Sequence, residues 1–243
     1  MSAPASVLLL IGSPKKGMST SEALGVRLLD RLGDRGVRGR VVRLHRALGP
    51  AGSRDEWLAL VESSDLVVLA TPLYVDSLPS HVIAALETIA TQRETRPAAP
   101  RRSQRFAALL NCGLPEARQN DTAVRICRQF ALETGFDWAG GLAMGGGEMI
   151  GGRPLGKLGR TARHVVAALD LAGDALAVGN SIPDDAVALM AKPLVTPALF
   201  AIIGDIGWRL QARKFGAQWR LHAQPYEESG LRAQGSGAGR PGA

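Results

Sequence analysis

The chain of 243 residues has few of the residues that build metal sites and disulfide frameworks. Its two cysteines, Cys112 and Cys127, do not form a C-x-x-C pair. This excludes an iron–sulfur cluster held by cysteines of one chain, and it gives no disulfide framework. The four histidines are scattered, without an H-x-x-x-H pair or a nearby carboxylate. We therefore predict no metal site.

Two common nucleotide-binding motifs are also missing. Gly12 and Gly17 fit the start of the P-loop pattern G-x-x-x-x-G-K-[ST], but Met18 stands where that pattern requires lysine. The dinucleotide fingerprint G-x-G-x-x-G is absent. A domain that binds NAD in the usual way also needs an acidic residue near the end of its second strand, where this chain has the basic residues Arg43, His45 and Arg46. The sequence therefore argues against a P-loop NTPase and against a standard NAD-binding domain.

No hydrophobic run is long enough to act as a targeting or spanning segment. Residues 7–11 are apolar, but no charged segment precedes them and the run is too short for a secretory signal. Residues 193–208 are strongly apolar, yet they include Asp205 and two prolines and fall short of the roughly 20 residues that a spanning helix needs. We expect a cytoplasmic protein.

The charge is strongly positive, with a net charge of +7 and a pI near 10.1. Nucleic-acid binding is the obvious class to consider. The arginines, however, are spread through the predicted helices and the tail, without a basic run interleaved with aromatic residues. A phosphate-bearing cofactor needs less charge than this, so we expect no nucleic-acid partner. The length and the 46% hydrophobic content predict one large domain, or a domain with an appendage.

What the sequence does contain, near its N-terminus, is a strand, a polar turn and a capped helix start. The apolar run at 7–11 suits a strand that is covered on both faces. Ser19 and Glu22 match the capping box S-x-x-E, with Ser19 as N-cap and Glu22 reaching back to the Ser19 amide. A helix that begins just beyond a parallel strand points its unpaired N–H groups and positive dipole end into the turn.

The same turn is rich in groups that bind phosphate. A well-capped but otherwise ordinary turn is the alternative, yet the hydroxyl and ammonium groups exceed what capping requires. We therefore favour a site for a phosphate monoester. The groups are the hydroxyls of Ser13, Ser19, Thr20 and Ser21 and the ammonium groups of Lys15 and Lys16.

Apolar runs and helical periodicity alternate along most of the chain. Such alternation predicts an α/β protein with a doubly wound parallel sheet of five strands. A first turn built for phosphate points to the strand order 2-1-3-4-5, with the site at the switch point between strands one and three. After the first strand, strands are predicted at 37–46, 65–71, 106–110 and 136–144. The crevice is then lined by residues 12–21, 72–78 and 111–116.

The C-terminal part is predicted to lie outside this domain. We divide the chain into a domain of residues 1–179, a helical extension of 180–228 and a disordered Gly/Arg/Ala-rich tail of 229–243. Aromatic residues stand beside cations in 193–220, a composition that suits a membrane surface and also suits a helix packed on a partner subunit. Of these two, we favour packing.

Three segments carry a resemblance to a known family: GSPKKGMSTSEAL, TPLYVDSLPSHVIAALE and NCGLPE. In order and spacing they resemble the flavodoxin-like NAD(P)H-dependent FMN reductases and quinone reductases, over about residues 6–150. That family has a phosphate loop rich in Ser and Thr, an S/T-P-x-Y loop after strand three and an asparagine–glycine loop after strand four. The cysteine cluster of its iron–sulfur branch is missing here.

The resemblance implies a flavodoxin-like fold, an FMN cofactor, NADPH or NADH as reductant, a small-molecule electron acceptor and a homodimer. It also implies roles for individual residues. Ser13, Lys15, Ser19, Thr20 and Ser21 would hold the FMN phosphate. Pro72, Leu73, Tyr74 and Val75 would lie along the isoalloxazine ring, and Asn111, Cys112 and Gly113 would meet its far edge or the ribityl chain.

Several of these residues have simpler interpretations. Tyr74 could be a half-buried loop residue, although we favour a flavin neighbour. Cys112 fits a small buried residue better than a nucleophile, and Asn111 may serve only a turn. The glycine-dense segment 145–152 is either a mobile connection or a lid over substrate.

We expect hydride transfer from NAD(P)H, through FMN, to a quinone, a nitro compound or free flavin. The cofactor carries that chemistry, so no catalytic residue is assigned. A flavodoxin-type electron carrier and a flavin-free scaffold of the same fold are the alternatives. Carriers of that type are usually shorter and acidic. The charge of +7 and the long extension therefore count against a carrier.

Overall fold

The chain forms two units, divided after Thr196. The computed structural model describes residues 3–49, 52–95 and 103–223. The first unit holds the sheet and its helices, and the second holds helix α9 (Pro197–Arg213). The predicted disordered tail, 229–243, lies outside the described residues.

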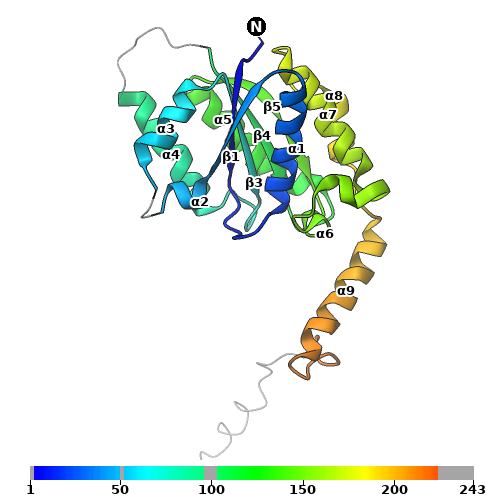
Figure 1. The fold of residues 1–243 in the computed structure, drawn as a ribbon. Helices are drawn as coiled ribbons and strands as arrows, with labels where there is room; N and C mark the ends of the chain where they lie inside the picture. Colours follow the sequence, from blue (N-terminus) through cyan, green and yellow to red (C-terminus); the bar gives the residue numbers. More distant parts are fainter. Residues whose placement is uncertain (1–2, 50–51, 96–102, 224–243) are drawn as a thin grey trace, which may run out of the picture. The chain divides into compact units, whose positions relative to one another are not determined.

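The first unit is built on a five-stranded parallel sheet with the order β2-β1-β3-β4-β5 (Figure 1). This confirms the predicted flavodoxin-like fold and its strand order. All carboxyl ends of a parallel sheet lie at one edge, so the loops that follow β1, β3 and β4 meet there. The strands are β1 (Ser6–Ile11), β2 (Arg38–Arg43), β3 (Leu66–Pro72), β4 (Arg105–Asn111) and β5 (Asp137–Met144).

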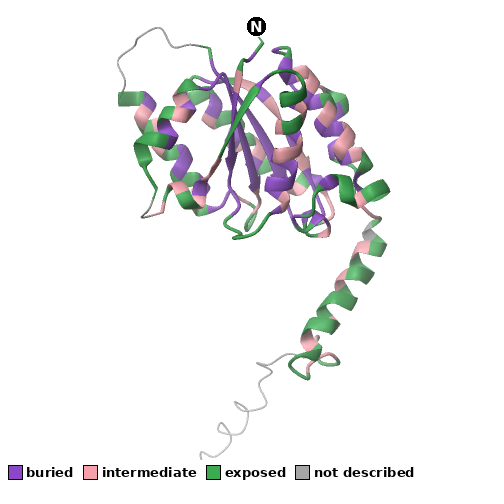
Figure 2. Ribbon diagram, viewed as in Figure 1, coloured by how far each residue is buried: buried purple, intermediate pink, exposed green. Residues whose placement is uncertain are grey.

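Burial differs between the central strands and the edge. In β1, β3 and β4 almost every residue is buried, as expected of apolar strands with helices on both faces. Strand β2 is exposed over most of its length and carries Arg38, Arg40 and Arg43. Charged side chains on an edge strand hinder unwanted pairing with another sheet, so the basic edge protects the fold. Figure 2 shows the buried strands at the centre of the unit.

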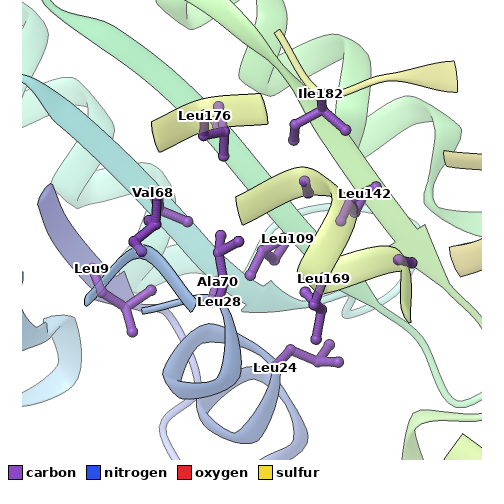
Figure 3. Close-up of a cluster of buried hydrophobic side chains, with 14 of the residues drawn as sticks. Leu9, Leu24, Leu28, Val68, Ala70, Leu109, Leu142, Leu169, Leu176 and Ile182 are labelled. Atoms are coloured by element: carbon purple, nitrogen blue, oxygen red, sulfur yellow. The ribbon is translucent and has the colours of Figure 1, made fainter. Parts of the chain in front are cut away.

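Helices cover both faces of the sheet. On one face, α1 (Thr20–Asp34), α7 (Arg163–Ala177) and α8 (Asp184–Met190) pack on alternate strand residues; Figure 3 shows Leu9, Val68 and Leu109 of the sheet with Leu24 and Leu169 of the helices. The opposite face is covered by α3 (Arg54–Ser63), α4 (Ser80–Thr95) and α5 (Asp121–Glu133), around Phe106. Two separate cores follow from this layering.

The short elements refine the prediction in two places. The helical periodicity of 155–176 is split between a 3-10 helix, η2 (Leu155–Ala162), which has a kink at Gly159 with φ +54°, and α7. The glycine-dense segment holds a short helix, α6 (Gly147–Ile150). The remaining short elements are α2 (Leu44–Ala47) and the 3-10 helix η1 (Ala117–Asn120).

The first unit extends further than the predicted domain. We expected it to end at residue 179, but residues 180–196 belong to the same compact unit. The reason is packing: Ile182, Ala186 and Met190 are buried in the core with α7, and the Ile182 amide donates a hydrogen bond to the Ala139 carbonyl oxygen at 2.8 Å. Sequence composition indicates where the sheet ends, but it does not predict that α8 packs on the same core.

The second unit is dominated by α9, which has 17 residues. Its apolar character is that expected from the sequence. Among the residues that the structure describes, none of the helices combines the length and hydropathy required to cross a membrane.

Candidate flavin site

The three predicted loops meet in one cavity of about 780 Å³ at the carboxyl edge of the sheet. That volume falls within the range typical of small-molecule and cofactor sites. Of the site residues predicted from the sequence, all line it except Lys16 and Val75. The lining residues are Ser13, Pro14, Lys15, Ser19, Thr20, Ser21, Pro72, Leu73, Tyr74, Asn111, Cys112, Gly113, Gly147, Glu148 and Gly151.

The start of α1 points at this cavity with the groups that bind anions. The Ser19 hydroxyl accepts a hydrogen bond from the Glu22 amide at 3.1 Å, which makes Ser19 the N-cap as predicted. The amides of Thr20 and Ser21 are in the first turn, where no intrahelical partner exists. Lys15 is exposed beside them, and its amide donates a long 3.4 Å bond to the Ser13 hydroxyl. The positive end of the α1 dipole, the serine hydroxyls and the Lys15 ammonium group therefore lie at the same part of the cavity.

Two of the predicted hydroxyls hold neighbouring loops in place. The Ser21 hydroxyl donates to the Asn111 side-chain oxygen at 2.7 Å, which ties α1 to the end of β4. The Thr20 hydroxyl donates to the Gly147 carbonyl oxygen at 2.6 Å, which ties α1 to the glycine-dense segment. These residues still present their amides to the cavity, but their hydroxyl protons are engaged within the protein.

One half of the predicted capping box is not formed. The Glu22 carboxylate was expected to reach back to the Ser19 amide, but it pairs with the guanidinium of Arg43 at the end of β2. Arg43 is the last residue of β2, the strand beside β1, so the two side chains meet across the first turn of α1. The pair braces the helix start that forms one wall of the cavity.

The loop after β3 ends in a tight two-residue turn. The Tyr74 amide donates to the Ser77 carbonyl oxygen at 2.9 Å, and the Ser77 amide donates back at 3.1 Å. Between them Val75 and Asp76 have positive φ, +48° and +58°, a backbone that a β-branched residue such as valine adopts only with strain. Val75 is 99% exposed at the tip, away from the cavity, while Tyr74 is 48% exposed and lines it.

Cys112 is buried and bonded rather than exposed and reactive. Its sulfur accepts from the Asn120 side-chain amide at 3.4 Å and donates to the Leu114 carbonyl oxygen at 3.4 Å. Burial raises the pKa of this thiol above its usual range, although the hydrogen bond from Asn120 opposes the rise. A thiol of raised pKa is a poor nucleophile, so the geometry favours the structural interpretation of Cys112.

The fourth wall of the cavity was not among the predicted site residues. Gly147, Glu148 and Gly151 line it, from the segment after β5. The glycines are needed because backbone packs on backbone: a Cβ on Gly152 would lie 1.9 Å from the Met18 carbonyl oxygen. The Gly147 amide also donates to the Cys112 carbonyl oxygen at 2.8 Å. The high glycine content of 145–152 was the sequence signal that this segment packs closely on other backbone. In the structure the segment forms one wall of the cavity.

The cavity fits an FMN group on the chemistry of its donors. A phosphate monoester requires hydroxyls, amides and a cation, which residues 13–21 supply together. A planar apolar ring requires apolar side chains, which Pro72 at the end of the neighbouring strand β3 and Leu73 and Tyr74 in the loop after it supply. The cavity thus has a polar part next to an apolar part, as expected for a site that binds an amphipathic nucleotide cofactor.

Comparison with known proteins agrees with this assignment. Residues 5–113 match the family model described as NADPH-dependent FMN reductase, which confirms the resemblance found in the sequence. The match covers less than half of the chain, and the family that it names is one of flavin-dependent oxidoreductases. FMN with a reduced nicotinamide nucleotide, the predicted cofactor set, is that of the matching family.

Solved structures with similar folds have low sequence identity. An NAD(P)H:quinone oxidoreductase from Methanothermobacter marburgensis is 16% identical with a TM-score of 0.53, over 72% of this chain and 96% of that one. The Trp repressor binding protein from Bacillus subtilis is 12% identical with a TM-score of 0.51, over 68% and 95%. Rubredoxin oxygen:oxidoreductase from Desulfovibrio gigas is 14% identical with a TM-score of 0.43, over 57% of this chain but only 29% of that one.

These structural likenesses show the fold alone. No curated protein sequence matches this chain. The function must therefore be argued from the family match over residues 5–113 and from the cavity itself.

Proposed function

We propose that this protein is an NAD(P)H-dependent oxidoreductase that binds FMN in the cavity and passes electrons to a quinone, a nitro compound or free flavin. The observation that carries the proposal is the convergence of the three loops. One cavity combines the anion-binding start of α1 with the apolar side chains of Pro72, Leu73 and Tyr74. The family match supports the choice of FMN and of a nicotinamide reductant.

The residues of the cavity divide the work of binding. Ser13, Ser19 and Lys15 contact the phosphate, together with the first amides of α1. Pro72, Leu73 and Tyr74 pack along the ring, and Gly113 allows close approach of the backbone. Thr20, Ser21 and Asn111 hold the loops in register through hydrogen bonds to Gly147 and to one another.

When bound, FMN supplies the two-electron chemistry between reduced nicotinamide and acceptor. The protein's part is to bind and orient both substrates. No side chain is assigned as catalytic acid or base. Acceptor reduction consumes one hydride and one proton, and the proton comes from solvent because the cavity is open to it.

The first experiment is an anaerobic absorbance titration of the purified protein with FMN, followed by NADPH or NADH. A bound flavin spectrum that bleaches with pyridine nucleotide supports the reductase. A bound flavin that does not bleach supports an electron carrier instead. Failure to bind any FMN leaves a flavin-free scaffold and removes the proposal.

A cytoplasmic location and a homodimer remain parts of the proposal. The homodimer follows from the resemblance to a family whose members are often dimers. Sedimentation velocity over a range of protein concentrations measures the oligomeric state, and a monomer at all concentrations contradicts it.

A further inference from the structure

The second unit carries an exposed apolar face. Ile202, Ile203, Ile206 and Leu210 recur at spacings of three and four residues on α9, so they lie on one side of the helix. Each of them is exposed. A soluble helix normally buries such a stripe. This face therefore needs an apolar environment.

Around and beyond that face, aromatic residues are mixed with cations. Trp208 is 67% exposed, Phe215 82% and Trp219 80%. Asp205 is the one acidic residue between 197 and 223, and it is neutralised by an ion pair of 2.7 Å with Arg209. The guanidinium of Arg209 also lies 5.8 Å from the centre of the Trp219 ring. The remaining cations, all exposed, are Arg213, Lys214 and Arg220.

This combination is more typical of a lipid surface than of a protein interface. The core of a protein–protein interface is also rich in aromatic residues and arginine, but it is depleted of lysine, and Lys214 is exposed beside Phe215. At a bilayer surface, tryptophan sits at the headgroup level, and nearby arginine and lysine contact anionic lipids. A helix of 17 residues is too short to span a bilayer but long enough to lie on it.

From this charge complementarity we propose that residues 202–220 bind the surface of an anionic membrane. The apolar face enters the boundary between headgroups and acyl chains, while Arg213, Lys214 and Arg220 contact lipid phosphates. This changes the preference stated from the sequence, which favoured packing on a partner subunit. The proposal does not depend on the flavin site.

The test is sedimentation of the full chain with lipid vesicles. We expect binding to vesicles that contain phosphatidylglycerol, weaker binding to pure phosphatidylcholine, and release by high salt. The double variant Arg213→Gln/Lys214→Gln should bind anionic vesicles about thirtyfold more weakly, which corresponds to roughly 1 kcal/mol for each cation. The variant Ile202→Ser/Ile206→Ser should lose at least tenfold, because two apolar side chains no longer enter the bilayer.

The matched control is Arg125→Gln/Arg128→Gln on α5, which removes the same charge from another helix. It should bind vesicles like the unaltered protein. An equal loss in this control means that net charge alone drives binding and overturns the assigned segment. Absence of binding to anionic vesicles also overturns it. So does a dimer that dissociates on Ile202→Ser/Ile206→Ser without any vesicle binding, because the face is then an interface between two copies.

Discussion

The hydroxyls of residues 13–21 look alike in the sequence but differ in the structure. Ser19 caps α1, Thr20 and Ser21 donate to Gly147 and Asn111, and Ser13 has only a long contact with the Lys15 amide. The Ser13 hydroxyl has no strong internal partner, and the Ser19 hydroxyl only accepts a hydrogen bond, so its proton can be donated to a ligand. Ser13 and Ser19 are therefore the most informative positions for the phosphate site.

Replacing Ser13 with alanine should weaken FMN binding about tenfold or more, because a hydrogen bond to a charged group contributes about 1.5–3 kcal/mol. Ser19→Ala should weaken binding and also cost about 1 kcal/mol of stability, since Ser19 is an N-cap. Ser53→Ala is the matched control, because Ser53 caps α3 and does not line the cavity. Fluorescence titration with FMN and urea unfolding measure the two effects. Unchanged affinity in the Ser13→Ala/Ser19→Ala double variant would remove the phosphate site.

Tyr74 tests the position of the flavin ring. Tyr74→Ala should shift the visible absorbance bands of bound FMN, because the ring loses an aromatic neighbour. Leu114→Ala is the control, since Leu114 is exposed and does not line the cavity. If the spectrum of Tyr74→Ala equals that of the unaltered complex, the ring lies elsewhere.

At the scale of elements, backbone conformation decides how the loops form walls. The turn after β3 places valine at φ +48°, and the segment after β5 places Gly152 at φ +77° against the Met18 carbonyl. One position holds a residue that its conformation disfavours, and the other holds the residue that its conformation requires. Substitutions at the two sites should have opposite effects on stability.

Val75→Asn should stabilise the protein by about 1 kcal/mol, because asparagine tolerates the backbone of this type of turn and valine does not. The side chain is exposed at the tip, so no packing is lost. The midpoint of thermal unfolding measures the change. A lower midpoint would mean that the observed backbone carries no strain.

Gly152→Ala should destabilise the segment after β5 by roughly 1–3 kcal/mol and weaken FMN binding, since a Cβ there would lie 1.9 Å from the Met18 carbonyl oxygen. Gly156→Ala is the matched control: no atom lies within 4 Å of the Cβ position, and its φ is not positive. Urea unfolding and FMN titration distinguish the two variants. Equal behaviour would show that this segment is not held against α1.

At the scale of the whole molecule, ion pairs join α1 to α7, two helices on the same face of the sheet. Asp174 of α7 accepts hydrogen bonds from Arg31 at 2.7 and 2.8 Å and from Arg35 at 2.8 Å, and Arg27 pairs with Asp170 at 2.5 Å. The hydrogen bonds from Arg31 and Arg35 lower the pKa of Asp174 below 3.8. These contacts link residues more than a hundred positions apart.

A lowered carboxyl pKa makes this contribution depend on pH. The charged form is stabilised in the folded state, so the stability is present above the unfolded pKa near 3.8 and is lost as pH falls through the folded value. Asp174→Asn should therefore lower the urea midpoint at pH 7 and change it less at pH 3. A difference of the same size at both values would show that the carboxylate charge contributes nothing. The pairs are partly exposed, so salt should reduce the effect at pH 7.

The sequence by itself determined the strands, their order and the three loops that converge on the cavity. The apolar runs of β1, β3 and β4 are local patterns, and parallel topology then places the segments after Ile11, Pro72 and Asn111 at one edge. Residue type was enough to single out Ser13 and Lys15 for that cavity, and the family resemblance singled out Tyr74.

Only the tertiary structure decided which groups pair across the site and where the first unit ends. The partners of Thr20 and Ser21 lie 127 and 90 residues away. The Glu22 carboxylate pairs with Arg43 instead of accepting a hydrogen bond from the Ser19 amide. Ile182 closes the core beyond the predicted boundary. Such contacts depend on packing between distant segments, which local periodicity and residue type do not encode.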